Sequence, residues 1–178
     1  LLANTGQPFS LQNLTKSLAI PAVAQTARYV EYLADAYLLV PVPKFSPSYK
    51  KRVVAPHKYY AIDNGLRRAN SPQATPDCGH RLENAVLLEL RRRGPPVCYA
   101  GEKSQWECDF VTETEAIQVC AELTPYNRDR ELGGVVRACR MPGKRRAVIL
   151  TLDQSEQLQE EGMAVSVEPA WEWLLGAG

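Results

Sequence analysis

The sequence lacks the features that would assign it to several large classes of protein. Its five cysteines are odd in number and form no Cys-x-x-Cys pair, which argues against a disulfide framework and against a structural zinc site. No stretch approaches the roughly 18 consecutive apolar residues that a membrane span needs. The 178 residues therefore predict one large domain or two small ones, in the cytoplasm and without a membrane partner.

Two further absences concern nucleotide binding and the start of the chain. No Gly-x-x-x-x-Gly-Lys-[Ser/Thr] motif occurs, so a phosphate-binding loop of that type is absent and we expect this chain not to bind ATP. The first residue is Leu1 rather than Met, and the chain opens inside a pattern. This start indicates a fragment of a longer polypeptide.

Acidic residues are absent between Asp35 and Asp63, and this gap lies within a basic part of the chain. Residues 1–69 hold nine Lys or Arg against three acids, a charge of +6, whereas residues 70–178 hold twelve against seventeen, a charge of −5. The gap itself contains Lys44, Lys50, Lys51, Arg52 and Lys58, interleaved with Phe45, Tyr49, Tyr59 and Tyr60. This mixture favours contact with a polyanion such as nucleic acid, the alternative being a solvated hairpin.

Residues 1–69 have the pattern of a winged helix-turn-helix. Ser10 is a good N-cap, and the apolar residues after it predict a short helix that ends near Pro21. Residues 22 to about 39 predict a second helix, whose buried face includes Tyr37. The exposed face would carry Gln25, Arg28, Tyr32 and Asp35. Extended runs at 38–42 and 58–62, with a turn at 46–48, predict a basic hairpin after the two helices.

A winged helix of this kind can bind DNA through its second helix and its hairpin. The residues expected to contact nucleic acid are Gln25, Arg28, Lys50, Lys51 and Arg52. The alternative is an internal module that packs on another domain, because Glu31 and Asp35 on the second helix would repel a DNA backbone.

The boundary between two domains is predicted at residues 70–79, which contain two prolines, a glycine and no apolar periodicity. One domain then spans 1–69 and the other 70–178. The second has patterns for a helix over 80–93, strands over 97–100, 106–112 and 116–121, a helix over 127–140 and a strand over 146–152. This α-β-β-β-α-β order is typical of an α/β (α+β) core with a mixed sheet. A strand over 163–167 and a helix over 169–175 follow, with one of Trp171 and Trp173 facing the core.

Carboxylates gather on the predicted strands and helix of this second domain. Because side chains alternate along a strand, Glu107 and Asp109 share one face, and Gln118 and Cys120 share a face of the next strand. The preceding helix offers Glu83. A Mg²⁺ ion prefers hard oxygen ligands, which Glu83, Glu107 and Asp109 could supply.

The alternative is a scaffold in which these carboxylates pair with basic groups such as Arg91 or Arg92. Cys120 would then be a buried and unreactive thiol, since no histidine or lysine close in sequence lowers its pKa.

A helix glutamate precedes Asp109, and eight residues separate Asp109 from Gln118-Val119-Cys120. This order resembles the PD-(D/E)xK nuclease core, which is restriction-endonuclease-like. The resemblance implies that Asp109 stands at the metal-binding aspartate and Glu83 at the first-helix acid. Gln118 then replaces the second acid and Cys120 the catalytic lysine. A neutral amide is a poorer Mg²⁺ ligand, and a thiol cannot supply a fixed positive charge, so the site is predicted to be degenerate.

A second resemblance covers nearly the whole chain. The runs that carry it are LLANTG, YVEYLADAYLL, KYYAIDNGL, RLENAVLLELRRRG, ECDFV and IQVC. They are similar to the C-terminal region of prokaryotic AAA-type ATPases that carry a nuclease-like domain of unknown function. The resemblance implies an ATP-binding module before Leu1, followed by a winged helix and the nuclease-like domain.

The favoured hypothesis is a noncatalytic nucleic-acid or protein recognition module that couples such an ATPase to its target. Two alternatives remain open: a metal-dependent DNA or RNA phosphodiesterase centred on Asp109, and a structural packing or dimerisation module. The expected partners are the ATPase domain of the same polypeptide, nucleic acid and a second copy of the chain. No cofactor is expected in this chain other than Mg²⁺, with ATP confined to the preceding module.

Overall fold

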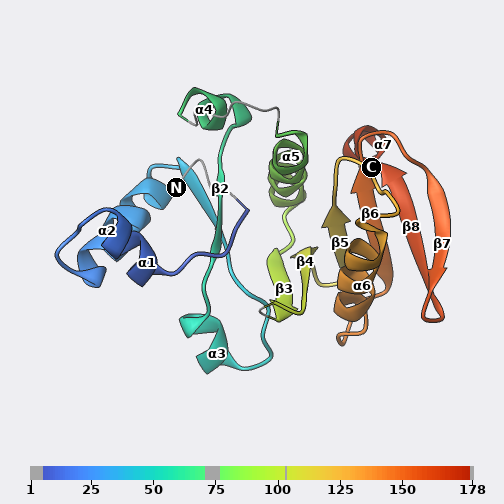
Figure 1. The fold of residues 1–178 in the computed structure, drawn as a ribbon, viewed down its shortest axis with the longest axis horizontal. Helices are drawn as coiled ribbons and strands as arrows, with labels where there is room; N and C mark the ends of the chain where they lie inside the picture. Colours follow the sequence, from blue (N-terminus) through green and yellow to red (C-terminus); the bar gives the residue numbers. More distant parts are fainter. Residues whose placement is uncertain (1–5, 71–76, 103, 177–178) are drawn as a thin grey trace. The chain divides into compact units, whose positions relative to one another are not determined.

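The computed structural model describes residues 6–70, 77–102 and 104–176 (Figure 1). The chain divides into two compact units, Leu1–Thr75 and Pro76–Gly178. The expected boundary, between residues 69 and 70, precedes a segment, 71–76, that lies outside the described residues. Within the described part, every helix is too short or too polar to cross a lipid bilayer.

The first unit begins with two packed helices and continues with an antiparallel pair of strands. Its elements are α1 (Leu11–Ser17), α2 (Val23–Asp35), β1 (Leu39–Val42), α3 (Tyr49–Val54), β2 (Lys58–Ala61) and α4 (Asn64–Ala69). Ser10 caps α1 as predicted, because its Oγ accepts a hydrogen bond from the backbone N–H of Asn13 at 3.1 Å. The buried hydroxyls of Thr15 and Thr26 lie 2.7 Å apart and join α1 to α2. The buried strands β1 and β2 supply most of this unit's core.

The second helix is shorter than its apolar pattern predicts, and the prediction that Tyr37 is buried was wrong. α2 ends at Asp35, and Tyr37 adopts a left-handed backbone with φ of 56°. The N–H of Leu38 then donates to the carbonyl of Leu33 at 2.9 Å, which closes the helix end. Tyr37 is left 72% exposed. The pattern missed this end because no glycine occupies the left-handed position.

A helix occupies the place where the sequence predicts the tip of a basic hairpin. The strands β1 and β2 do pair, but α3 lies between them and carries Lys50, Lys51 and Arg52. Lysine and arginine favour helices, and no glycine or proline interrupts the run. The helix stops at Ala55, whose backbone is extended as expected before Pro56. The hairpin is therefore wider than predicted, with its basic residues on a helical turn.

The second unit is an α/β structure built on a mixed sheet, as predicted. Its elements are α5 (Cys78–Arg93), β3 (Cys98–Glu102), β4 (Trp106–Val111), β5 (Glu115–Val119), α6 (Arg128–Cys139), β6 (Arg146–Thr151), β7 (Glu156–Glu160), β8 (Met163–Pro169) and α7 (Ala170–Leu175). The six strands lie in the order β3-β4-β5-β6-β8-β7, and only the β5–β6 and β6–β8 pairs are parallel. α6 packs on β4, β5 and β6, whereas α5 packs on β5 and α7.

The strand β7 was not predicted, because it is an edge strand with little apolar content. Of its residues only Leu158 is buried. A two-residue turn joins it to β8, and both turn residues, Glu161 and Gly162, have positive φ as this kind of hairpin requires. The prediction for the two tryptophans is confirmed, since Trp173 is 6% exposed and Trp171 is 55% exposed.

Candidate functional site

The strands β4 and β5 bring Asp109 and Gln118 together in the second unit. Phe110 pairs with Ile117, so Asp109 and Gln118 lie opposite each other on the same face of the sheet. Both side chains are buried. The Asp109 carboxylate accepts a hydrogen bond from the backbone N–H of Val119 at 3.0 Å, and the Asp109 N–H donates to Oε1 of Gln118 at 3.3 Å. Two positions of the predicted nuclease pattern are therefore in direct contact.

The Gln118 amide extends this contact to the helix α6. Its Nε2 donates to Oε2 of Glu131 at 2.6 Å, and Glu131 is only 1% exposed. The other carboxylate oxygen of Glu131 accepts from Nε of Arg130 at 3.1 Å, and the terminal Nη2 of the same arginine donates to it as well. The Arg130 side chain is 78% exposed. We call these four residues, Asp109, Gln118, Glu131 and Arg130, the Gln118 network.

The thiol of Cys120 lies within reach of the charges of this network. Burial, together with the negative charges of Glu131 and Asp109, raises the pKa of Cys120 to about 12 against the opposing effect of Arg130. The thiol is therefore neutral at physiological pH. It supplies neither a cation nor a ready nucleophile, so the expectation of an unreactive thiol is supported by its surroundings.

Glu83 and Glu107 complete the set of acids singled out in the sequence. Glu83 is buried on α5, and Glu107 is half-buried on β4. The backbone of Glu107 is covered closely by α6, because a Cβ added to Gly134 would lie 2.1 Å from the Glu107 carbonyl oxygen. Within residues 6–70, 77–102 and 104–176, no three His, Cys, Asp or Glu side chains are grouped so that they could hold a metal ion.

The chemistry of the donors also fits Mg²⁺ poorly. At the two positions after Asp109 in the nuclease pattern, the chain offers a neutral amide and a protonated thiol, neither of which is a hard anionic oxygen. The amide is already engaged on both of its ends. These donors therefore do not support a metal-dependent step at this site.

Arg92, one of the two arginines that the sequence suggested as partners for Glu83, Glu107 and Asp109, pairs with another acid of its own helix. Arg92 donates from Nε and Nη2 to the carboxylate of Glu89, both at 2.7 Å, and these bonds with those of Arg93 lower the pKa of Glu89 to about 2. A further buried acid, Glu131, is paired with Arg130, and sequence analysis missed both residues. A signal was present: Glu131 lies four residues before the buried Val135, on the face of α6 where an apolar side chain is expected.

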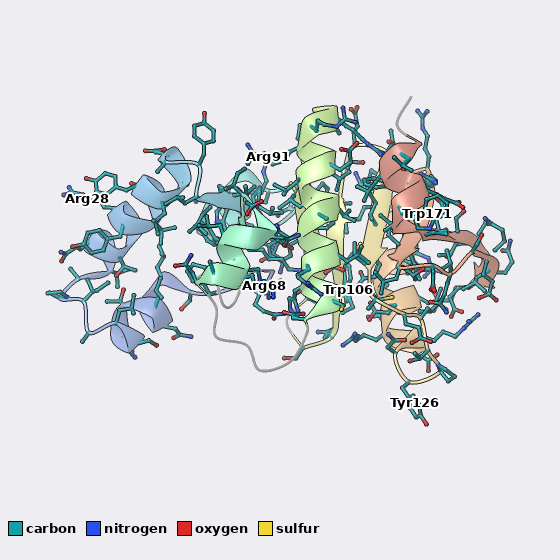
Figure 2. The ribbon with its side chains drawn as sticks, turned by 90° about the horizontal axis from the view of Figure 1, so that it is seen from above. Arg28, Arg68, Arg91, Trp106, Tyr126 and Trp171 are labelled. Atoms are coloured by element: carbon teal, nitrogen blue, oxygen red, sulfur yellow. The ribbon has the colours of Figure 1, made fainter. Side chains whose placement is uncertain are left out.

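The residues predicted to contact nucleic acid lie on two helices of the first unit. Gln25 and Arg28 are exposed on α2 and line a shallow depression together with Tyr29 and Tyr32. Figure 2 shows Arg28 pointing outward from this helix. α2 packs against α1 and β1, whereas α3 belongs to the connection between β1 and β2.

The surface charge of the first unit is smaller than its sequence suggests. Lys50, Lys51 and Arg52 on α3 are exposed. Lys58, which the sequence placed among the basic residues facing a polyanion, is only 1% exposed, and Arg67 is 3% exposed. The interpretation of Lys58 as a surface contact was therefore wrong, because its position in β2 points into the core.

Comparison with known proteins finds one family model and two relatives. Residues 1–77 match a family model described as a domain of unknown function (DUF8612). The chain is 32% identical over 166 residues to "Uncharacterized protein MJ1544" of Methanocaldococcus jannaschii. This alignment covers 83% of this chain and 35% of that protein. It is 26% identical over 179 residues to an "Uncharacterized protein" of Haemophilus influenzae, covering 96% of this chain and 43% of that protein. The chain thus spans less than half the length of each of these curated relatives. No solved structure matches it significantly.

Proposed function

We propose that this chain is a noncatalytic recognition module from the C-terminal region of a AAA-type ATPase, in which a winged helix precedes a PD-(D/E)xK nuclease-like domain with a degenerate site. Its role is to hold nucleic acid for the ATPase. The relatives are more than twice as long as this chain, which leaves room in them for a further domain.

Two features of the fold support this proposal. The second unit has the element order α5-β3-β4-β5-α6-β6 on a mixed sheet, which is the order of the nuclease-like core. The first unit has two packed helices followed by an antiparallel strand pair, as a winged helix does. The helix α3 within that pair departs from a simple wing.

The Gln118 network is the observation that supports the noncatalytic part of this proposal. In a working site of this type, the second acid and a lysine would face the metal-binding aspartate. Here the Gln118 amide donates to the buried Glu131, so a carboxylate at 118 would lie beside another carboxylate. Arg130 brings the positive charge that the missing lysine would supply, but its guanidinium is bound to Glu131. The buried polar groups satisfy one another and leave little to act on a phosphodiester.

Titration calorimetry with Mg²⁺ and with Mn²⁺, together with cleavage assays on single- and double-stranded DNA and RNA, tests this part. We expect no heat of metal binding and no cleavage. Metal-dependent cleavage that disappears in Asp109→Ala would overturn the proposal and favour the phosphodiesterase. Asp153→Ala is the matched control, because Asp153 is an exposed aspartate of the same unit.

The exposed basic residues of the first unit carry the nucleic-acid part. We expect Lys50→Ala/Lys51→Ala to weaken binding equally on all sequences and to reduce the slope of log affinity against log salt by about 1 for each lysine. The control is Arg137→Ala/Arg145→Ala, which removes two exposed charges from the second unit. Equal affinities of the two double variants at low salt would contradict a role for α3.

A further inference from the structure

The exposed face of α2 carries two tyrosines that the sequence analysis did not assign to nucleic acid. Tyr29 and Tyr32 are 46% and 63% exposed, although large aromatic side chains are usually covered. They line one depression of about 450 Å³ together with Gln25 and Arg28. The four side chains recur at spacings of three and four, so they form one stripe along the helix.

The contacts in this stripe fix one of the two rings. Nε2 of Gln25 donates to the hydroxyl of Tyr29 at 2.6 Å, which ties the end of that side chain to the preceding helical turn. A tyrosine held in this way loses little further freedom when another ring stacks on it. The adjacent guanidinium of Arg28 is exposed and suits a phosphate group.

The acids on α2 do not close this stripe to an anion. Glu31 acts electrostatically on Tyr59 of β2, so it lies toward the strand pair, and not in the depression. Asp35 is the last residue of the helix, two turns beyond Arg28. Residues 1–69 carry a formal charge of +6, and without the buried Lys58 and Arg67 the excess is still +4, which complements a polyanion.

We propose that Tyr29 and Tyr32 of α2 are stacking platforms for the unpaired bases of a single-stranded nucleic acid, with Arg28 on its backbone. A duplex hides the faces of its bases, whereas a single strand exposes them to aromatic side chains. This inference rests on the proposed nucleic-acid recognition and names the form of nucleic acid that it takes.

Fluorescence anisotropy of the 178-residue chain tests the inference, with labelled oligothymidylate and oligouridylate of about 15 nucleotides and a duplex of the same length as probes. We expect the single strands to bind more tightly than the duplex. Tyr29→Ala and Tyr32→Ala should each weaken single-strand binding between about fivefold and about 150-fold. Tyr32→Phe should keep the wild-type affinity, because the ring remains. The two oligonucleotides distinguish DNA from RNA, and preference for either supports the inference.

Tyr126→Ala is the matched control, because Tyr126 is 100% exposed in the other unit and projects from the loop before α6 (Figure 2). Circular dichroism of each variant checks that it is folded. If Lys50→Ala/Lys51→Ala weakens binding but the tyrosine variants match Tyr126→Ala, the stacking inference is wrong and the proposed function survives. If the wild-type chain binds no nucleic acid, both are wrong. A wild-type dimer that dissociates in Tyr29→Ala/Tyr32→Ala, with nucleic-acid affinity unchanged, assigns the stripe to a second copy of the chain and overturns the inference.

Discussion

Replacing Gln118 by glutamate tests the Gln118 network most directly. The substitution exchanges only the side-chain NH₂ for an oxygen, and it restores the acid of the nuclease pattern. In the wild-type chain Nε2 of Gln118 lies 2.6 Å from Oε2 of Glu131. A carboxylate at 118 would place two negative oxygens at this distance, a repulsion of about 6 kcal/mol at an effective dielectric constant of about 20. The folded protein avoids most of this repulsion by keeping one proton between the two acids.

The loss in free energy of unfolding caused by Gln118→Glu then depends on the pH. Holding a proton at pH 7 on a glutamate whose ordinary pKa is about 4.3 costs about 3–4 kcal/mol, and at pH 5 it costs about 1 kcal/mol. The pKa of the new acid is raised by folding, so the loss of stability is absent below the unfolded pKa and grows as the pH rises above it. Below pH 4.3 the protonated acid can donate to Glu131 as the amide does.

Urea unfolding of wild type and Gln118→Glu at several pH values measures this loss. All three tryptophans, Trp106, Trp171 and Trp173, lie in the second unit, so their fluorescence reports its unfolding. The exposed Gln159→Glu, also on a strand, is the matched control and should change stability by no more than about 0.5 kcal/mol at any pH. Equal stability of Gln118→Glu and wild type at pH 7, or a loss that does not vary with pH, would refute the contact between Gln118 and Glu131.

Three further predictions follow from the second unit. Gly134→Ala should destabilise it by about 1–3 kcal/mol in urea unfolding, since the new Cβ meets the Glu107 carbonyl at 2.1 Å, whereas Gly133→Ala meets nothing within 4 Å and should stabilise the helix by about 1 kcal/mol. Cys120 should resist a thiol reagent in the native protein at pH 8 and react only after unfolding, as read by mass spectrometry; rapid native labelling would contradict its burial and raised pKa. Glu89→Gln should lower stability at pH 7, and this difference should fade as the pH falls from about 4.5 to about 2, because the lowered pKa of the wild-type carboxyl gives stability only while it is charged; a pH-independent difference would argue against its two arginine partners.

The fold of the second unit could be predicted well from local pattern. The end of α5 at Gly94 is one example. This residue has φ of 97°, a left-handed backbone conformation that glycine adopts readily because it has no side chain. Two of the missed elements, β7 in this unit and α4 in the first, were missed for different reasons. β7 is polar because it is an edge strand. α4 is short, and its N-cap Asp63, whose side chain accepts from the N–H of Leu66 at 2.7 Å, stands in a sequence that looks like a turn.

The candidate site was predicted in part. The alternation of side chains gave the face of each strand that Asp109 and Gln118 occupy, whereas the pairing of Phe110 with Ile117, which sets the two opposite each other, came only from the structure. The local signal that Glu131 enters the core, its place four residues before the buried Val135, was outweighed because a charged residue in the first turn of a helix is usually solvated and favoured there by the helix dipole. Arg130 was missed for the same reason, because its role depends on its pairing with the buried Glu131.

The sequence by itself determined the chemistry available: an amide and a thiol where a nuclease pattern has an acid and a lysine, and a basic, tyrosine-bearing first part of the chain. Only the tertiary structure decided how these groups are used. α6 docks on β4 and β5 at a glycine, which brings a buried carboxylate against the amide and raises the pKa of the thiol. The physical reason is that hydrogen bonding and desolvation depend on distances between residues far apart in the chain, whereas a local pattern records only which face each residue occupies.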